Sequence, residues 1–428
     1  MNDAGDQYAH SPVPEGVTVP GWRVGLIVAS FSIGLPDFLN GAHNALALGL
    51  WKAALAALLA GVILCIGGCL TAIVSVRSRL LTYLLTRRSF GSGGAALINT
   101  VMAFISFCWF GVNASFFGEA IQTAAAINGL PGGTAVYVLF GGVLMTVSTI
   151  VGFRSLSRLA LFAVPIIGFI LAAVLIVTLR THGLFTAPAP HPPEPMRFGI
   201  AVSALLGAYM IAVATMPDLT RFVRSPGGAV VAMAMSFPVA IPAMMTAAAI
   251  PALATGETSL MKLVGSLSFG TPLLFLLVLP TWSLNASNLY SASLSLSTTF
   301  PAVREWMFTV IGGVIGTLLA LVGILEAFIP FALFLGLIIP PIAAIYVIDG
   351  FTRFRGKRAK EIDPDARVMR WAAIIVWLGS AGVAALGAYT GWTVTSVPAL
   401  DATLAAGLGY WTISRWVDPR APSVAVVQ

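Results

Sequence analysis

The chain has 428 residues, of which 58% are hydrophobic and only 9% are charged. A soluble globular protein carries about 25% charged residues, so this composition excludes a soluble enzyme. It also excludes a disordered chain, which would lack apolar residues. The apolar runs are continuous rather than alternating, which argues against a β-barrel. The composition therefore predicts an all-α polytopic membrane protein.

Twelve apolar runs have about the length that crosses the hydrocarbon of a bilayer, which takes roughly 20 helical residues. The first, third and eighth runs are longer than a straight span needs, which predicts a tilt or a break in each. In chain order the runs cover residues 24–50, 53–76, 95–127, 134–151, 159–179, 199–216, 229–253, 271–299, 307–325, 328–348, 371–389 and 394–413.

The basic residues predict the orientation of these spans. If the amino terminus is cytoplasmic, all but four of the 23 Lys and Arg residues fall on the cytoplasmic side, as the positive-inside rule requires. The exceptions are Lys52, Arg180, Arg197 and Lys262. We therefore expect a multi-pass protein of the cell membrane with both termini in the cytoplasm. The net charge of +7 is explained by loops that face anionic lipid, so we expect the bilayer, and no nucleic acid, as a partner.

The three cysteines, Cys65, Cys69 and Cys108, all lie inside apolar runs. Their spacing matches neither a disulfide framework nor a zinc site. We expect core thiols, no cofactor and no metal site at these cysteines.

The first apolar run contains Gly34, Leu35, Pro36 and Asp37 about halfway along its length. Proline removes a backbone donor and glycine weakens a helix, so we expect a break there. A break at membrane depth must line a cavity, and secondary transporters place such breaks in matching positions of two inverted repeats.

The corresponding segment of the second repeat is the sixth run, with Gly207 near its middle and the pair Pro217–Asp218 near its cytoplasmic end. The predicted organisation is a cytoplasmic tail (1–23), two inverted five-helix repeats (24–198 and 199–350), a basic loop (351–370), two peripheral helices (371–413) and a second tail (414–428).

Two runs carry polar and aromatic residues in patterns suited to a ligand. Ser106, Trp109 and Asn113 share one face of the third run, and an aromatic platform beside an amide suits a flat heterocycle. Helix packing is the alternative explanation of a single tryptophan. In the eighth run we expect Asn285 and Asn288 to be functional, and the serines that follow them to pack against other helices.

Five motifs together resemble one family, the nucleobase–cation symporter family 1, in its cytosine permease branch. They are RSFGSGG (88–94), CWFGV (108–112), MPDLTRFVR (216–224), TWSLNASNLYSA (281–292) and IIPPIAAIYVID (338–349). The resemblance covers almost the whole chain. It implies a LeuT-like core of ten helices with two peripheral helices, and cation-coupled import of a nucleobase or related heterocycle by alternating access. We expect a monomer.

The resemblance also implies a substrate site. Trp109 corresponds to the tryptophan on which the base stacks, Tyr209 to an aromatic residue on its other face, and Asn285 to the asparagine that reads the base edge. The other implied contacts are Asn113, Ser106, Ala208 and Leu35. Ser106 stands where close cytosine permeases have a glutamine, which leaves the identity of the base open between cytosine, a purine and another heterocycle.

The cation site implied by the resemblance departs from the family pattern. Sodium-coupled members use carbonyls that correspond to Phe31, Gly34 and Pro280, and two adjacent hydroxyls, whereas here Ser283 is followed by Leu284. Asp37 is a carboxylate at the helix break, where close relatives have a neutral residue. The coupling ion is therefore Na⁺ or H⁺.

Three roles are open for Asp37. It could be a proton site with His43 as a neighbour, a cap of the outer half-helix, or a contact to a basic ligand nitrogen. An ionisable residue at membrane depth favours a functional role.

Other functions fit less well. A channel would need a filter-like motif, and a membrane enzyme would need a catalytic cluster, but His43 is the one histidine inside an apolar run. An amino-acid carrier with the same architecture remains the alternative within transporters. Such a carrier would present helix N–H groups to a carboxylate and would not need Trp109 with Asn285.

Overall fold

The computed structural model describes residues 13–183, 196–267, 270–354 and 368–417. The side chains of 152–161 are not described. Most of the predicted basic loop, parts of both tails, and the side chains of Arg154 and Arg158 therefore lie outside the described residues.

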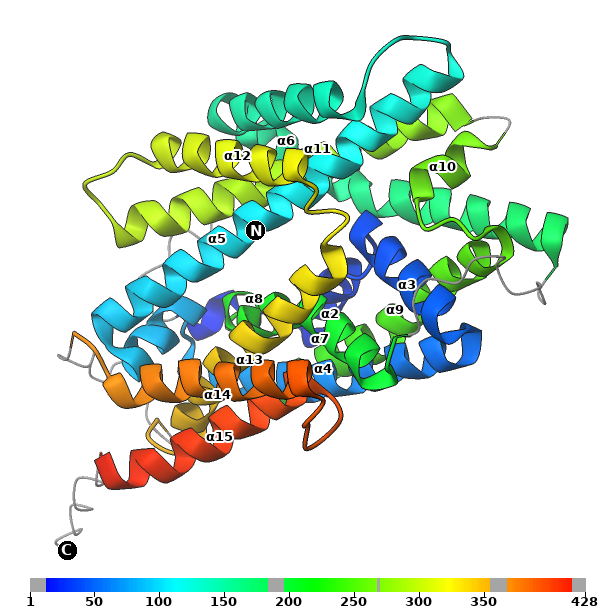
Figure 1. Cartoon of the computed structure of the whole chain (residues 1–428). Helices are drawn as coiled ribbons and strands as arrows, with labels where there is room; N and C mark the ends of the chain where they lie inside the picture. Colours follow the sequence, from blue (N-terminus) through cyan, green and yellow to red (C-terminus); the bar gives the residue numbers. More distant parts are fainter. Residues whose placement is uncertain (1–12, 184–195, 268–269, 355–367, 418–428) are drawn as a thin grey trace, which may run out of the picture.

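The described residues form a bundle of long helices (Figure 1). The β pairing described in these ranges is a single bridge between Val19 and Val223. The elements are η1 (Glu15–Val17), α2 (Gly21–Ser30), α3 (Leu35–Leu48), α4 (Leu50–Ser78), α5 (Thr82–Ile127), α6 (Thr134–His182), α7 (Phe198–Ala214), α8 (Met216–Thr220), α9 (Pro226–Thr255), α10 (Leu260–Gly265), α11 (Gly270–Thr299), α12 (Glu305–Val322), α13 (Phe328–Phe351), α14 (Trp371–Thr390) and α15 (Pro398–Val417).

Within the described ranges, nine helical stretches are long and apolar enough to cross a membrane, and α6 supplies two of them. The bent pair α2–α3 makes a tenth span. Adding α7, an apolar helix just below the span length, and α15 is consistent with the twelve predicted segments. The prediction of an all-α, multi-pass membrane protein is confirmed.

The predicted break in the first segment is confirmed. α2 and α3 meet at an angle of 66° across residues 31–34. Gly34 precedes α3 with an extended backbone, and Pro36 lies in the first turn of the new helix. A proline is tolerated there because the first N–H groups of a helix have no intrahelical partner. The break follows from these local residues.

The sixth segment differs from the first. α7 runs through Gly207 without interruption, and the chain breaks at Thr215. The short α8 follows, with Pro217 in its first turn. A Cβ on residue 207 would lie 1.7 Å from the carbonyl oxygen of Ala332 on α13. Gly207 therefore allows two helix backbones to approach and does not bend its own helix.

Two helices extend beyond their predicted ends. α5 starts at Thr82, well before residue 95, and changes direction at Gly91, which has a φ of 83°. α6 continues through the loop expected between the fourth and fifth runs. The polar residues expected in that loop continue the helix, which also runs on through Pro165.

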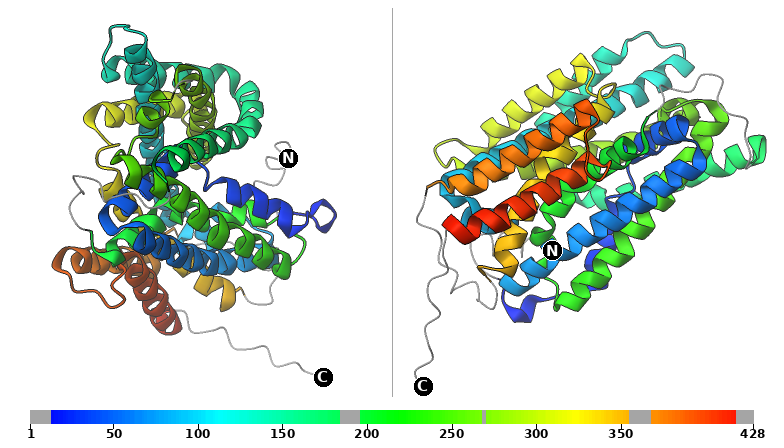
Figure 2. Two further views of the ribbon diagram at one scale, coloured as in Figure 1. Left: turned by 90° about the vertical axis from the view of Figure 1, so that its right-hand side faces the viewer. Right: turned by 60° about the horizontal axis from the view of Figure 1, so that its bottom comes forward.

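Two large apolar clusters share the interior. One gathers residues of α2, α4, α7, α9 and α13, and the other gathers residues of α3, α5, α6, α9, α10 and α11. The peripheral helices α14 and α15 lie side by side at one edge of the bundle (Figures 1 and 2).

The peripheral helices are attached to α13 by polar contacts. Trp377 of α14 donates a hydrogen bond of 2.8 Å to the carbonyl of Ile338. The buried Asp349 lies 3.4 Å from Arg370, and it accepts hydrogen bonds from Tyr410 of α15 at 3.1 Å. Asp349 thus links three helices.

It lies at the end of the molecule where α4 ends and α5 begins. We call this the basic end, because it carries Arg77, Arg79, Arg221, Arg224, Arg353 and Arg370.

Candidate functional site

Trp109 lies where the two apolar clusters meet, since it packs against both of them. Its ring makes edge contacts with Phe328 and Phe331 of α13, at centroid distances of 6.0 and 5.5 Å. Its indole Nε1 is buried and has no hydrogen-bond partner among the described residues. A buried indole N–H normally finds a partner, so this donor is available to a ligand.

Ser106 and Asn113 flank Trp109 on the same face of α5, as predicted. The Ser106 hydroxyl donates to the carbonyl of Met102 at 3.1 Å, and the Asn113 amide donates to the carbonyl of Trp109 at 3.0 Å. Both bonds return to the helix backbone, so a rotation of either side chain could exchange them for bonds to a ligand.

The break between α2 and α3 faces α7. Tyr209 of α7 donates a hydrogen bond of 2.5 Å to the Asp37 carboxylate. Leu35 packs in the same cluster as Trp109, and Ala208 packs against the cluster that contains Tyr209. The structure therefore brings Asp37 and Tyr209 together at the break, with Leu35 in the first turn of the same helix.

Asp37 is 9% exposed and lies in the first turn of α3, next to Gly34, where its charge favours the positive end of the helix. The N-cap residue of this helix is Gly34, which has no side chain to act as a cap. Pairing with Tyr209 was not part of any sequence prediction, because residues so far apart in the chain carry no signal of contact.

The two asparagines of α11 have different surroundings. Asn285 is fully buried, and its amide donates to the carbonyl of Phe110 and contacts the Met145 sulfur, both at 3.1 Å. Its carbonyl oxygen has no partner within the described part of the chain. Asn288 is exposed, so the structure gives no support to the functional role expected for it.

The residues predicted for a cation site differ in their burial and in their hydrogen bonds. Ser283 is fully buried, and its hydroxyl has no hydrogen-bond partner in the described residues. Pro280 is buried one turn before it on α11. The Gly34 carbonyl accepts from the Phe38 N–H at 3.2 Å, and Phe31 is 44% exposed.

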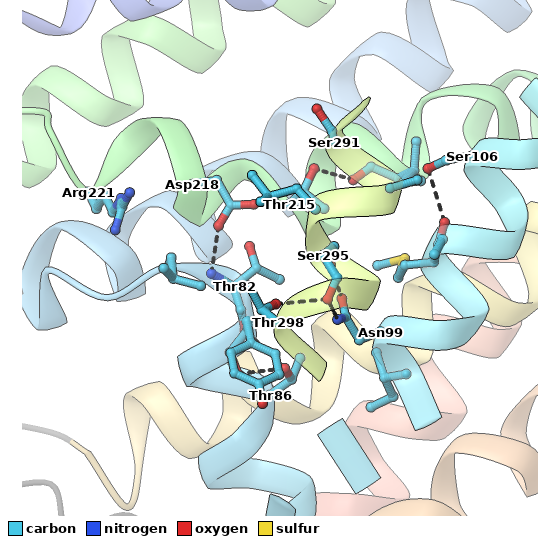
Figure 3. A pocket seen from close by; sticks show the side chains of 18 residues that line it. Thr82, Thr86, Asn99, Ser106, Thr215, Asp218, Arg221, Ser291, Ser295 and Thr298 are labelled. Carbon is cyan, nitrogen blue, oxygen red and sulfur yellow. Dashed lines mark hydrogen bonds between the residues drawn. The ribbon is translucent and has the colours of Figure 1, made fainter. Parts of the chain in front are cut away.

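A cavity of about 370 Å³ extends from Ser106 to the basic end (Figure 3). One wall consists of the end of α7 and α8, and the other walls are the first half of α5 and the last turns of α11. Hydroxyl, amide and charged side chains line it: Thr82, Thr86, Asn99, Ser106, Thr215, Asp218, Arg221, Ser291, Ser295 and Thr298. Asp218, Ser291 and Thr298 are exposed, so water reaches the cavity.

Two sets of hydrogen bonds connect the helices that line the cavity. The Asp218 carboxylate accepts from the Thr82 N–H at 2.8 Å and so caps the start of α5 from another helix. Asn99 bonds Ser295 twice, to its carbonyl at 2.9 Å and its hydroxyl at 2.5 Å. Sequence reasoning missed Asn99, although it stands seven residues before Ser106 and therefore on the same helix face.

No group of three or more metal-ligating side chains occurs in the ranges that the structure describes. Cys65, Cys69 and Cys108 are free thiols. His43 is partly buried, and no contact between it and Asp37 is described. Glu119 accepts a hydrogen bond from the hydroxyl of Ser259, the residue before α10.

The sequence of almost the whole chain is similar to that of known permeases. Residues 27–411 match the family model of permeases for cytosine/purines, uracil, thiamine and allantoin. The cytosine permease of Escherichia coli K12 is 25% identical over 413 residues, which cover 95% of this chain and 93% of that protein.

Solved structures share the fold. The inward-facing conformation of Mhp1 has a TM-score of 0.80 at 19% identity and covers 95% of this chain and 92% of that one. A closed conformation of Mhp1, a nucleobase-cation-symport-1 family transporter, with bromovinylhydantoin bound has a TM-score of 0.75, also at 19% identity, with 95% of each chain covered. A Na⁺-coupled sialic acid symporter is more distant, with a TM-score of 0.56 at 14% identity and coverage of 94% and 91%. The match over nearly all of the sequence, together with the broken first helix, shows that the chain belongs to the cytosine/purine permease family of membrane transporters and is not an enzyme.

Proposed function

We propose that this protein imports a flat nucleobase-like heterocycle by alternating access, driven by a cation gradient. The observation that carries the proposal is the unpartnered indole N–H of Trp109 at the junction of the two apolar clusters. A flat ring stacked beside this indole would gain aromatic contact, and its polar edge could use Ser106 and Asn113 on the same helix face. The substrates named for the family, cytosine and purines among them, have this chemistry.

An amino-acid carrier is the weaker alternative. Such a carrier binds the substrate carboxylate at the N-terminus of a broken helix. Here that place already holds a carboxylate, because Asp37 lies in the first turn of α3. Like charges so close together would repel, which favours a neutral substrate.

For the coupling ion we propose H⁺, with Asp37 as the group that carries it. Na⁺ requires several oxygen ligands, and Leu284 occupies the position of the second hydroxyl in the expected site. Asp37 is buried at a helix break and shares a hydrogen bond with Tyr209. A carboxylate held in this way can take up a proton when water reaches it.

We also propose how the protein is oriented in the membrane. The basic end faces the cytoplasm, as the distribution of Arg and Lys suggests, and the cavity in Figure 3 is then the inner vestibule. Both termini lie inside the cell, and one chain is sufficient for transport.

The test is a thermal-shift and uptake screen of purines, pyrimidines and hydantoins, with and without Na⁺ and at two pH values. We expect stabilisation and uptake with one of these heterocycles, stimulated by an inward proton gradient. A screen in which no heterocycle stabilises the protein would refute the substrate class. Uptake that requires Na⁺ and ignores pH would remove the proton from the proposal and leave the substrate class intact.

A further inference from the structure

α3 carries two buried amides beyond the site described above. Asn40 and Asn44 stand three and seven residues after Asp37, so the three side chains share one face of the helix. We call these three residues the polar stripe. The amides are 1% and 2% exposed. Other residues of α3, including Phe38, Ala42 and Leu46, pack in an apolar cluster, so the stripe stands out within this helix.

The two amides satisfy each other only in part. The Asn44 amide nitrogen donates to the Asn40 side-chain oxygen at 2.9 Å. The Asn40 nitrogen and the Asn44 oxygen have no hydrogen-bond partner in the part of the chain that the structure describes. A buried donor and a buried acceptor left unpaired at membrane depth are costly. Water can accept from the first and donate to the second, and polar sites with several such partners hold it.

The stripe leads away from the cavity. A helix rises about 1.5 Å per residue, so Asn44 lies about 10 Å beyond Asp37, toward the turn between α3 and α4. That turn is at the start of α4, whereas the basic end is where α4 finishes. Asp37 is thus the end of the polar stripe nearer the basic end, and Asn44 is the end nearer the opposite face.

We propose that Asn40 and Asn44 hold a short file of water that carries protons between Asp37 and the membrane face opposite the cavity. A proton from that face would pass along the water to the Asp37 carboxylate and leave later toward the cavity. The amides only donate and accept hydrogen bonds and do not titrate. This inference rests on the proposed role of Asp37 in proton coupling.

His43 lies on α3 itself, next to Asn44 in the chain, and is partly buried. Few other titratable groups approach the stripe from the helices packed on α3. Tyr209 of α7 contacts Asp37 directly. On α5, Glu119 is bonded to Ser259, and on α10, Lys262 pairs with Glu257. Lys52 at the start of α4 is exposed, and α9 carries no titratable residue along its length.

The experiment compares Asn40→Leu and Asn44→Leu with Asp37→Asn and with the control Asn288→Leu, which removes an exposed amide. Each is reconstituted in vesicles, and the probe is the radiolabelled heterocycle selected by the screen above. Two rates are measured: uptake driven by a pH gradient, and exchange of external for internal substrate, which needs no net proton movement.

We expect both leucine variants to lose gradient-driven uptake and keep exchange, while Asn288→Leu keeps both. Gradient-driven uptake at the parental rate in both leucine variants would overturn the water file, provided that Asp37→Asn has lost it. If Asp37→Asn itself keeps gradient-driven uptake, the proton role of Asp37 fails and the water file fails with it.

A second measurement does not depend on the variants folding. A density map of the parental protein that resolves water should show a molecule bonded to the Asn40 nitrogen and the Asn44 oxygen. Amides bonded only to protein atoms in that map would overturn the proposal.

Discussion

At the scale of single residues, two tryptophans in the interior of the bundle differ in one hydrogen bond. Trp282 donates from its indole to the Ser148 hydroxyl at 2.8 Å. The Trp109 indole has no such partner among the described residues. Both residues are aromatic, partly buried and far from a span end, so helix packing alone explains Trp282 and leaves the Trp109 donor unexplained. This difference separates a structural tryptophan from one suited to a ligand.

We therefore expect Trp109→Ala to weaken binding of the heterocycle and Trp282→Ala to leave it unchanged. Stacking of a base on an aromatic ring contributes about 1–3 kcal/mol, so the loss in affinity should be roughly five- to 150-fold. The measurement is the dissociation constant of purified protein, by isothermal titration. Equal affinities of Trp109→Ala and the parent would show that the stacking residue is misassigned.

At the scale of helices, close backbone approaches matter as much as breaks. α7 and α13 touch at Gly207, where a Cβ would meet the Ala332 carbonyl oxygen at 1.7 Å. The next two residues of α7, Ala208 and Tyr209, belong to the candidate site. The contact between the helices thus sets how far Tyr209 stands from the break that carries Asp37.

Gly207→Ala should destabilise the protein because its methyl group would force the two helices apart. Overpacking of this kind costs about 1–3 kcal/mol. Gly379→Ala on α14 is the matched control, since nothing lies within 4 Å of the added carbon, and alanine favours a helix by about 1 kcal/mol over glycine. Thermal unfolding in detergent compares the two variants. A melting temperature of Gly207→Ala at or above that of the control would contradict the close approach.

At the scale of the whole molecule, the cavity walls come from separate parts of the bundle. α7 and α8 form one wall, and α5 and α11 form the others (Figure 3). Alternating access requires these walls to approach when the opposite end opens. The contacts of Asp218 with Thr82 and of Asn99 with Ser295 hold helix ends in place at the basic end.

Cysteines placed at the two ends test the orientation. In a background with Cys65, Cys69 and Cys108 replaced by alanine, Thr298→Cys in the cavity should react with an impermeant thiol reagent in inside-out vesicles only. Thr134→Cys, at the exposed start of α6, should react in right-side-out vesicles only. The reverse pattern would place the basic end outside the cell and refute the orientation.

The sequence by itself determined the solvent, the helical class, the break in the first helix and the family. These properties depend on composition, local backbone chemistry and short motifs, none of which requires knowledge of contacts between distant residues. Gly34 and Pro36 both disfavour a continuous helix, so their closeness in the chain predicts a break without knowledge of the neighbouring helices. The same reasoning failed for Gly207, because a glycine inside a helix can serve either a bend or a close contact, and only the neighbouring α13 distinguishes them.

The tertiary structure alone decided which polar groups meet and which remain unpaired. It paired Asp37 with Tyr209, 172 positions apart in the chain, and it gave the Trp282 indole a hydrogen-bond acceptor. It left polar atoms of four other residues without partners among the described residues: Trp109, Ser283, Asn40 and Asn44. No local pattern encodes these outcomes, because a hydrogen bond between distant residues depends on the packing of every helix between them. The scarce polar groups of a membrane interior are therefore assigned by the fold, and we propose that their unpaired atoms bind substrate and water.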